Sequence, residues 1–130
     1  MARAPQPRVS EKAEQHHIVQ LARSIGGQVW VLGTTRRRGD FAGTMQTPGV
    51  SDLILFVPRR PEGRELVFLE VKGQGGRLRP EQIQFRECCL AAGATHLVGG
   101  LDRFIAFLVE RGLVKADAFP HYRQPKEFQS

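Results

Sequence analysis

Residues 52–72 read DLILFVPRRPEGRELVFLEVK and contain two apolar runs separated by a polar segment rich in proline and glycine. The first run extends from Asp52 to Val57 and is apolar after its first residue, and the second extends from Glu65 to Lys72. Apolar runs of this length that are bounded by proline and glycine are typical of β-strands, and Pro58 to Arg64 suits a turn. The sequence therefore predicts an antiparallel β-hairpin whose turn is centred near residues 60–62.

Charged residues enter the second of these apolar runs. Glu70 and Lys72 share one face of the strand, roughly 7 Å apart, because successive side chains alternate between faces. The other face, which is directed to the core, consists of Val67, Leu69 and Val71. Positions 52 and 70 are about equally far from the turn centre, so the hairpin brings Asp52 opposite Glu70. Charge in a strand is costly unless it is paired or binds an ion, and this cost indicates a functional site at the open end of the hairpin.

The segments around the hairpin predict a mixed α/β domain. Ser10 suits the N-cap of a helix that begins at Glu11 and is ended by Gly26-Gly27. The further elements that we expect are a strand at 29–32, a long loop at 33–48, a helix at 80–92, a strand at 95–98 and a helix at 101–111. The order helix, three strands, helix, strand, helix corresponds to one small sheet flanked by helices. We expect this domain to span residues 10–114, between a flexible tail at 1–9 and a polar, weakly ordered tail at 115–130.

Composition supports a single basic domain. The chain has 130 residues, a net charge of +6 and a sequence pI of about 10.1, which favours polyanionic partners. It contains neither an apolar run as long as a membrane span nor a recognisable signal peptide, so we expect a cytosolic protein that does not enter a membrane. Cys88 and Cys89 are adjacent in a predicted helix and are expected to be reduced.

The carboxylates at the hairpin end suggest a metal site. Asp52 and Glu70 offer hard oxygen ligands that suit Mg²⁺ or Mn²⁺, and the backbone carbonyl of Val71 would be a third ligand. A divalent ion there would act on a phosphate and lower the pKa of a bound water. Lys72 would orient or deprotonate that water, or stabilise charge that develops on phosphorus. The alternative is a simple salt bridge between Lys72 and one of the two carboxylates at a sheet edge.

Three segments together resemble the VRR-NUC family, a branch of the PD-(D/E)XK nucleases. They are Gly49-Val50-Ser51-Asp52, Phe68-Leu69-Glu70-Val71-Lys72-Gly73 and Gly76-Arg77-Leu78-Arg79-Pro80-Glu81-Gln82. The resemblance extends from about Glu11 to Leu113, and it implies a restriction-endonuclease-like core whose element order agrees with the one predicted above. Ser51 departs from the superfamily, which commonly has proline before the motif aspartate.

The resemblance implies a divalent-metal-dependent endonuclease that hydrolyses phosphodiester bonds of DNA with Mg²⁺ or Mn²⁺. Asp52 and Glu70 would hold the metal together with the Val71 carbonyl, and Lys72 would be the catalytic lysine. Gln82, in the first turn of the second helix, would support the site or contact the water. The family also has a glutamate on its first helix. Glu14 is our preferred match, and Glu11 and Gln15 are the alternatives.

Substrate and partners follow from the same resemblance. A small stand-alone member is similar to the phage or prophage type, which implies a homodimer that acts on branched DNA such as four-way junctions in a bacterial or phage-infected cell. The apolar residues of the last helix and the loop before Pro48 are the candidate dimer interface. The candidate DNA contacts are Arg36, Arg37, Arg38, Arg77 and Arg79, because guanidinium groups suit phosphate. Trp30 is expected in the core or at its rim rather than as a platform for base stacking.

Two other functions compete with the enzyme. One is a DNA-binding module without catalysis, which predicts a damaged site. The other is a basic protein-interaction domain whose hairpin is salt-bridged, which accounts for the charges but not for their spacing.

Overall fold

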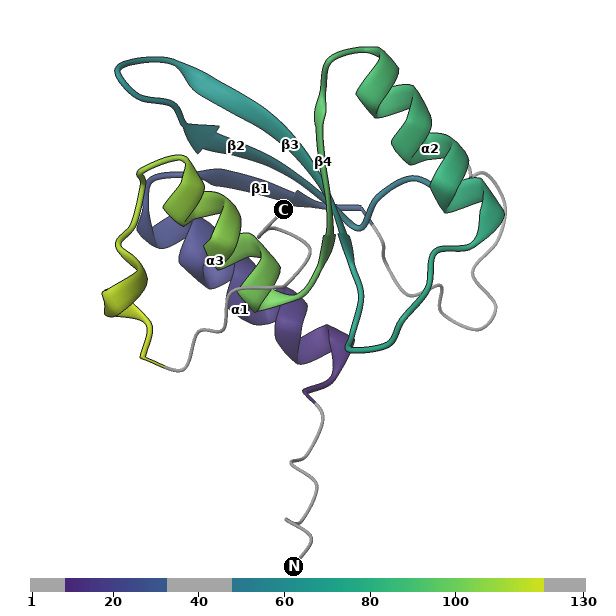
Figure 1. Cartoon of the computed structure of the whole chain (residues 1–130), viewed down its shortest axis with the longest axis horizontal. Coiled ribbons are helices and arrows are strands. Elements are labelled where there is room, and N and C mark those ends of the chain that lie inside the picture. Colours follow the sequence, from purple (N-terminus) through teal and green to yellow (C-terminus); the bar gives the residue numbers. More distant parts are fainter. Residues whose placement is uncertain (1–8, 33–47, 121–130) are drawn as a thin grey trace, which may run out of the picture.

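A computed structural model describes residues 9–32 and 48–120 and shows one four-stranded sheet with helices on both faces (Figure 1). The elements are α1 (Glu11–Ser24), β1 (Gln28–Val31), β2 (Leu53–Pro58), β3 (Arg64–Val71), α2 (Pro80–Ala91), β4 (Thr95–Gly99), α3 (Leu101–Glu110) and a short 3-10 helix, η1 (Ala116–Ala118). This order confirms the predicted succession of helices and strands, with ends that differ by a residue or two.

The sheet has the strand order β1-β2-β3-β4. β1 and β3 each pair with β2 in antiparallel orientation, whereas β3 and β4 are parallel and are connected through α2. Leu53 lies opposite Leu69, so the register extended by one residue places Asp52 at the level of Glu70. The predicted hairpin and its pairing are therefore confirmed.

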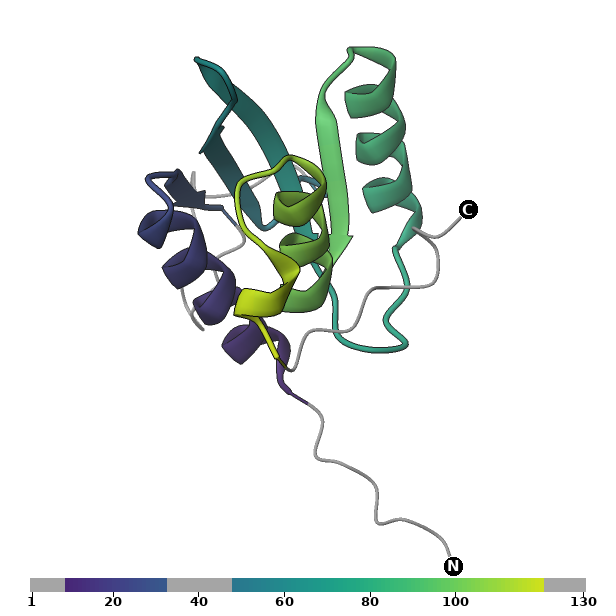
Figure 2. The same cartoon turned by 60° about the vertical axis from the view of Figure 1, so that its left-hand side comes forward.

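The main core lies between the sheet and the pair α1 and α3, which lie side by side on one face (Figure 2). Its buried members from the helices are Ile18, Ala22, Phe104, Phe107 and Leu108, and those from the strands are Leu53, Leu55, Val57, Val67, Leu69, Val71 and Leu97. The apolar residues of α3 are thus used inside the domain. α3 therefore does not offer the apolar surface that the dimer hypothesis assigns to it.

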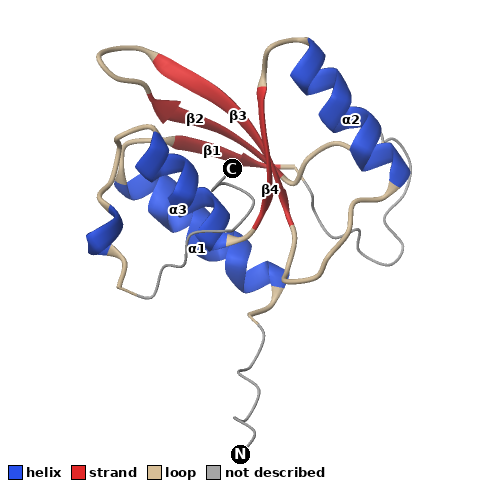
Figure 3. Cartoon of the chain, viewed as in Figure 1, coloured by secondary structure: helices blue, strands red, loops and turns tan. Residues whose placement is uncertain are grey.

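The opposite face of the sheet is covered by α2 beside β4 (Figure 3). Phe85 of α2 packs edge-to-face on Phe68 of β3 with ring centroids 5.4 Å apart, and its ring lies 5.9 Å from that of His96. Burial lowers the pKa of His96, which favours a neutral imidazole in this packing layer. Trp30 of β1 is not covered, because it is 53% exposed, and it packs edge-to-face on Phe56. It therefore lies at the rim and not in the core, with an aromatic neighbour that the sequence pattern did not indicate.

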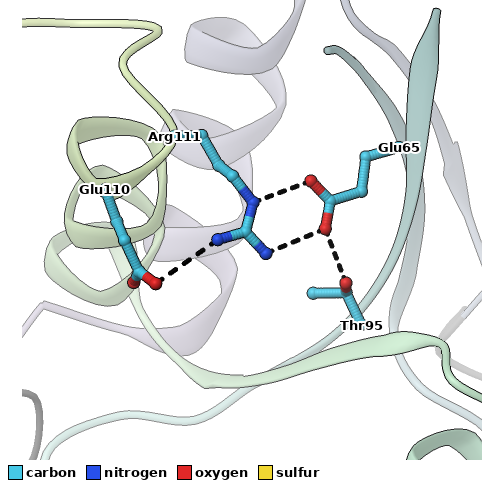
Figure 4. Close-up of polar contacts among 4 residues, drawn as sticks. All are labelled: Glu65, Thr95, Glu110 and Arg111. Carbon is cyan, nitrogen blue, oxygen red and sulfur yellow. Dashed lines mark hydrogen bonds and ion pairs between the residues drawn. The ribbon is translucent and has the colours of Figure 1, made fainter. Parts of the chain in front are cut away.

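A polar network ties β3, β4 and the end of α3 together (Figure 4). The guanidinium of Arg111 donates to both carboxylate oxygens of Glu65, at 2.8 and 3.0 Å, and the hydroxyl of Thr95 donates to the same carboxylate at 2.6 Å. Arg111 also lies over the ring of Phe107. Sequence reasoning missed this network, because its members are far apart along the chain.

The chain after α3 differs from its prediction. The sequence predicts weak order from Lys115 onward, but Ala116–Ala118 form η1, which packs on α3. Residues 1–8, 33–47 and 121–130 lie outside the described part of the chain, and so does most of the long loop that is predicted before Pro48.

Candidate active site

Asp52 is held at the end of the sheet by backbone groups of two strands. Its Oδ2 atom accepts a hydrogen bond of 2.8 Å from the N–H of Val71, at the end of β3. Its carbonyl oxygen accepts a hydrogen bond of 2.7 Å from the N–H of Leu32, directly after β1. These contacts fix the carboxylate beside the last residues of β3, as the hairpin register requires.

Glu70 is the most strongly perturbed acid in the described part of the chain. It is only 4% exposed, and burial is the largest cause that raises its pKa, to about 8. A hydrogen bond with Asp52 and repulsion by the Asp52 charge raise the pKa of Glu70 further, while Lys72 and Arg79 act in the opposite direction. At neutral pH, Glu70 is therefore mostly protonated when no cation is bound beside it.

Lys72 follows Glu70 on the same face and is half-buried. Its backbone N–H donates to the carbonyl of Gly99 at 3.1 Å, which continues the parallel pairing of β3 and β4 beyond Val71. In the part of the chain that the structure describes, Lys72 forms no ion pair with Glu70 or Asp52. A simple salt bridge therefore does not account for these charges.

The N-cap residue of α2, Arg79, lies near enough to Glu70 to act on its charge. Gln82 is buried, and its Oε1 atom accepts a hydrogen bond of 2.7 Å from the backbone N–H of Arg79. Gln82 thus caps α2, which satisfies a backbone donor that a helix start leaves free. The Oε1 atom of Gln82 is thus engaged in a structural hydrogen bond, which stabilises the beginning of α2.

Gly49 joins the loop before Asp52 to α2. It is buried and has a φ of +97°, and a Cβ atom at this position would lie 2.7 Å from the carbonyl carbon of Glu81. Only glycine permits this close approach of two backbones. The segments Gly49–Asp52 and Gly76–Gln82, which are far apart in the sequence, are therefore in direct contact.

The two glutamates of α1 contact different backbone groups at this end of the sheet. Glu14, our preferred first-helix residue, accepts a hydrogen bond through Oε2 from the N–H of Leu101, so it caps α3. Glu11 accepts from the N–H of Gly73 at 3.4 Å, and Gly73 directly follows Lys72. Among the described residues, no hydrogen bond joins either glutamate to Asp52 or Glu70.

Comparison with known proteins shows the family of the chain. The model of a family described as "VRR-NUC domain" matches residues 2–97, which include both carboxylates, Lys72 and Gln82. The chain belongs to the VRR-NUC family. That family is a group of PD-(D/E)XK nucleases, so the chain has a nuclease-type domain. A solved structure described as "VRR_NUC domain" has the same fold, with a TM-score of 0.56 and 24% identity over 77% of this chain and 94% of that chain. None of the curated proteins matches the chain significantly.

The structure describes two of the five arginines that are predicted to contact DNA. Arg77 and Arg79 are exposed in the segment that leads into α2, and Arg79 approaches Glu81 to 3.5 Å while its side chain stays 67% exposed. The charge of Arg79 also lowers the pKa of Glu70, so Arg79 acts on the candidate site. The three consecutive arginines at 36–38 lie outside the described residues.

The donor set suits the divalent metals that PD-(D/E)XK nucleases typically use. Asp52 and Glu70 present hard carboxylate oxygens, and a divalent cation between them would remove the repulsion that raises the pKa of Glu70. Within residues 9–32 and 48–120, no group of three or more histidine, cysteine or acidic side chains is arranged to hold a metal ion. The remaining ligands would therefore be backbone carbonyls, water and phosphate oxygens, as is usual for Mg²⁺. Among the same residues, no helix combines the length and hydropathy that a membrane crossing requires.

Proposed function

We propose that the protein is a divalent-metal-dependent endonuclease that hydrolyses phosphodiester bonds of DNA. The observation that carries this proposal is the pair of facing carboxyl groups of Asp52 and Glu70, with Lys72 on the same face of β3. Burial of Glu70 beside a second carboxyl group is costly without a cation, and such a cost is characteristic of functional sites. Membership of a nuclease family supports the same reaction class.

Each residue of the site has a separate task. Asp52 and Glu70 would hold Mg²⁺ or Mn²⁺ with the carbonyl of Val71, and a bound ion supplies Lewis-acid activation of phosphate and water. Lys72 stabilises the negative charge that develops on the phosphate, or positions and deprotonates the attacking water. Gln82 acts as a positioning residue, because it caps the helix that packs on the Asp52 loop.

The first-helix glutamate is assigned a positioning role. Glu14 holds the N-terminus of α3 and thereby the turn that follows β4, which pairs with β3 next to Glu70. Glu11 contacts the backbone directly after Lys72, and it remains the alternative. Alanine in place of each glutamate separates the two, because it removes the hydrogen bond. Loss of the positioning residue should slow cleavage by the folded variant, whereas loss of the other glutamate should leave the cleavage rate unchanged.

The substrate that we propose is branched DNA, cleaved by a homodimer. A net charge of +6 favours binding to DNA, and two copies of the site would suit the two strands of a four-way junction. Cleavage by a monomer, as measured by light scattering of the active species, would contradict this part of the proposal without affecting the chemistry.

The central experiment compares four proteins on linear, nicked, flapped and four-way DNA with Mg²⁺ or Mn²⁺. They are the wild type, Asp52→Ala, Lys72→Ala and the control Lys115→Ala, which removes an exposed lysine far along the chain from the site. We expect cleavage by the wild type and the control, and a loss of at least about 100-fold in the two site variants with binding retained. Binding without cleavage by the wild type would identify a DNA-binding module instead. Cleavage by Lys72→Ala at the wild-type rate would remove the role of Lys72.

A further inference from the structure

The face of the sheet that carries Glu70 and Lys72 continues as an aromatic surface on β1 and β2. Residues that share a face with Glu70 include Trp30, Ile54, Phe56 and Phe68, because they occupy paired positions in neighbouring strands. α2 covers this face beside β4 and contacts Phe68 through Phe85, and no described helix covers the part on β1 and β2 (Figure 3).

Trp30 is the most accessible aromatic residue of this surface. It is 53% exposed, and the centroid of its indole ring lies 5.4 Å from that of Phe56 at an interplanar angle of 80°. An edge-to-face contact of this kind favours this orientation of the indole while leaving ring surface open to solvent. A large aromatic side chain that is oriented by a neighbouring ring and left exposed suits a ligand with a flat aromatic surface.

The position of Trp30 relative to the carboxylates follows from the strand register. Trp30 lies opposite Ile54, which lies opposite Phe68, two residues before Glu70. Two interstrand spacings of about 4.8 Å and one two-residue step along the strand place the Cα atoms of Trp30 and Glu70 about 12 Å apart. The indole is therefore within a few nucleotides of a phosphate bound at Glu70. Beyond it on the same face, Arg64 provides a cation at the far end of β3, where it donates to the carbonyl of Gly26.

We propose that Trp30, supported by Phe56, is a stacking platform for an unpaired base of the DNA strand that is cleaved at Glu70. This inference rests on the proposed nuclease function and assigns a specificity to it, namely a preference for DNA with an unpaired base near the scissile phosphate. Stacking tolerates any base, because each base has a π-face, so the platform selects for single-stranded character and not for sequence. A fully paired duplex offers no such base to the indole.

Because Trp30 is the only tryptophan of the chain, its fluorescence reports on this contact directly. The titration uses the full chain in EDTA, so no cleavage takes place, with a short oligothymidylate and an abasic oligonucleotide of the same length as ligands. We expect quenching that saturates with oligothymidylate and is much smaller with the abasic strand, which has the same phosphates but no bases. Unchanged fluorescence at saturation, or equal quenching by both strands, would overturn the platform.

Variants test the energetic contribution of the ring. Trp30→Ala should weaken binding of oligothymidylate by between about 5-fold and 100-fold while binding of the abasic strand stays unchanged, and Trp30→Phe should restore most of the loss. Leu90→Ala is the matched control, because Leu90 is apolar and 54% exposed but lies near the end of α2. Circular dichroism checks that each variant is folded. If Trp30→Ala does not fold, the wild-type titration and Trp30→Phe still decide the question.

Three further outcomes separate this inference from its alternatives. If Trp30→Ala converts an oligomeric wild type to a monomer and binds oligothymidylate as before, the surface is a protein interface and the platform is overturned. Base-dependent quenching in a protein that cleaves no DNA supports the platform and contradicts the nuclease. Cleavage without quenching supports the nuclease and contradicts the platform.

Discussion

Replacing Gly49 with alanine adds one methyl group at the contact between the Asp52 loop and α2. The methyl carbon would lie 2.7 Å from the carbonyl carbon of Glu81 and 3.2 Å from its Cβ atom, so one of the two backbones must move. Alanine at a φ of +97° costs about 1–2 kcal/mol, and overpacking of a tight contact costs about 1–3 kcal/mol more. We therefore expect Gly49→Ala to lower the free energy of unfolding by about 2–5 kcal/mol.

Gly63→Ala is the matched control for this substitution. Gly63 has a similar φ of +91° in the turn between β2 and β3, but a Cβ atom there would meet nothing within 4 Å. Gly63→Ala should therefore lower the free energy of unfolding only by the backbone strain, which is about 1–2 kcal/mol. Urea denaturation, followed by circular dichroism, measures both losses.

Cleavage assays on the two variants test whether the contact positions the site. Since Asp52 follows Gly49 closely, a shift of the loop misplaces its carboxylate, and we expect Gly49→Ala to cleave DNA roughly 10- to 100-fold more slowly than Gly63→Ala. Equal stability losses in the two variants would refute the packing argument. Equal cleavage rates would refute the idea that this contact holds Asp52.

The other predictions concern the ionisable groups of the fold. The pKa of Glu70 rises from 4.5 to about 8 on folding, so in EDTA the free energy of unfolding should decrease between these pH values, and Glu70→Gln should remove the decrease in a series of urea titrations. Arg111→Ala should cost about 1–2 kcal/mol at neutral pH in thermal melts, because it breaks two charged hydrogen bonds that are partly exposed. The pKa of Glu65 is lowered, so this contribution is present above its ordinary value of 4.5 and is lost as the pH falls through the folded-state pKa. Glu14→Ala should cost about 0.5–2 kcal/mol through the lost cap on α3, and Gly100→Ala, whose methyl group would lie 2.7 Å from the Glu14 carboxyl carbon, should act on the same contact.

Specific results would contradict each of these predictions. A wild-type stability in EDTA that does not change between acid and neutral pH would mean that Glu70 is not held against Asp52. An Arg111→Ala penalty that persists in acid would arise from packing on Phe107 and not from Glu65. Strictly additive losses for Gly100→Ala and Glu14→Ala would show that the two residues do not share one contact.

The elements and their order were predictable because hydrophobic periodicity and turn residues are local signals. The hairpin register was predictable for the same reason, since the turn and the alternation of Val67, Leu69 and Val71 leave only one pairing that buries the apolar face. The same register sets Asp52 at the level of Glu70, so the meeting of the two acids was predictable as well.

Contacts between distant segments were not predictable. Nothing in the local pattern shows that Gly49 lies on Glu81 or that Glu14 caps α3, because both contacts depend on how the helices dock on the sheet. The exposure of Trp30 depends in the same way on which part of the sheet α2 leaves uncovered. In the sequence, only the glycine at position 49 pointed to the first of these contacts, and the reason for a glycine there becomes clear only once Glu81 is seen beside it.

The division between the local hairpin and the distant helix α2 has a consequence for the order of folding. The hairpin closes over a short turn, so Asp52 and Glu70 come together early, while both are still hydrated. We expect Glu70 to lose its water only when α2 docks on the Gly49 loop and β4 adds to β3, because these steps require closure of a longer loop. We therefore expect the energetic conflict between the two acids to arise late, after the main folding barrier has been crossed. Cations that bind the pair should consequently slow unfolding more than they accelerate folding, and the nuclease domain would then have a longer native lifetime when loaded with metal.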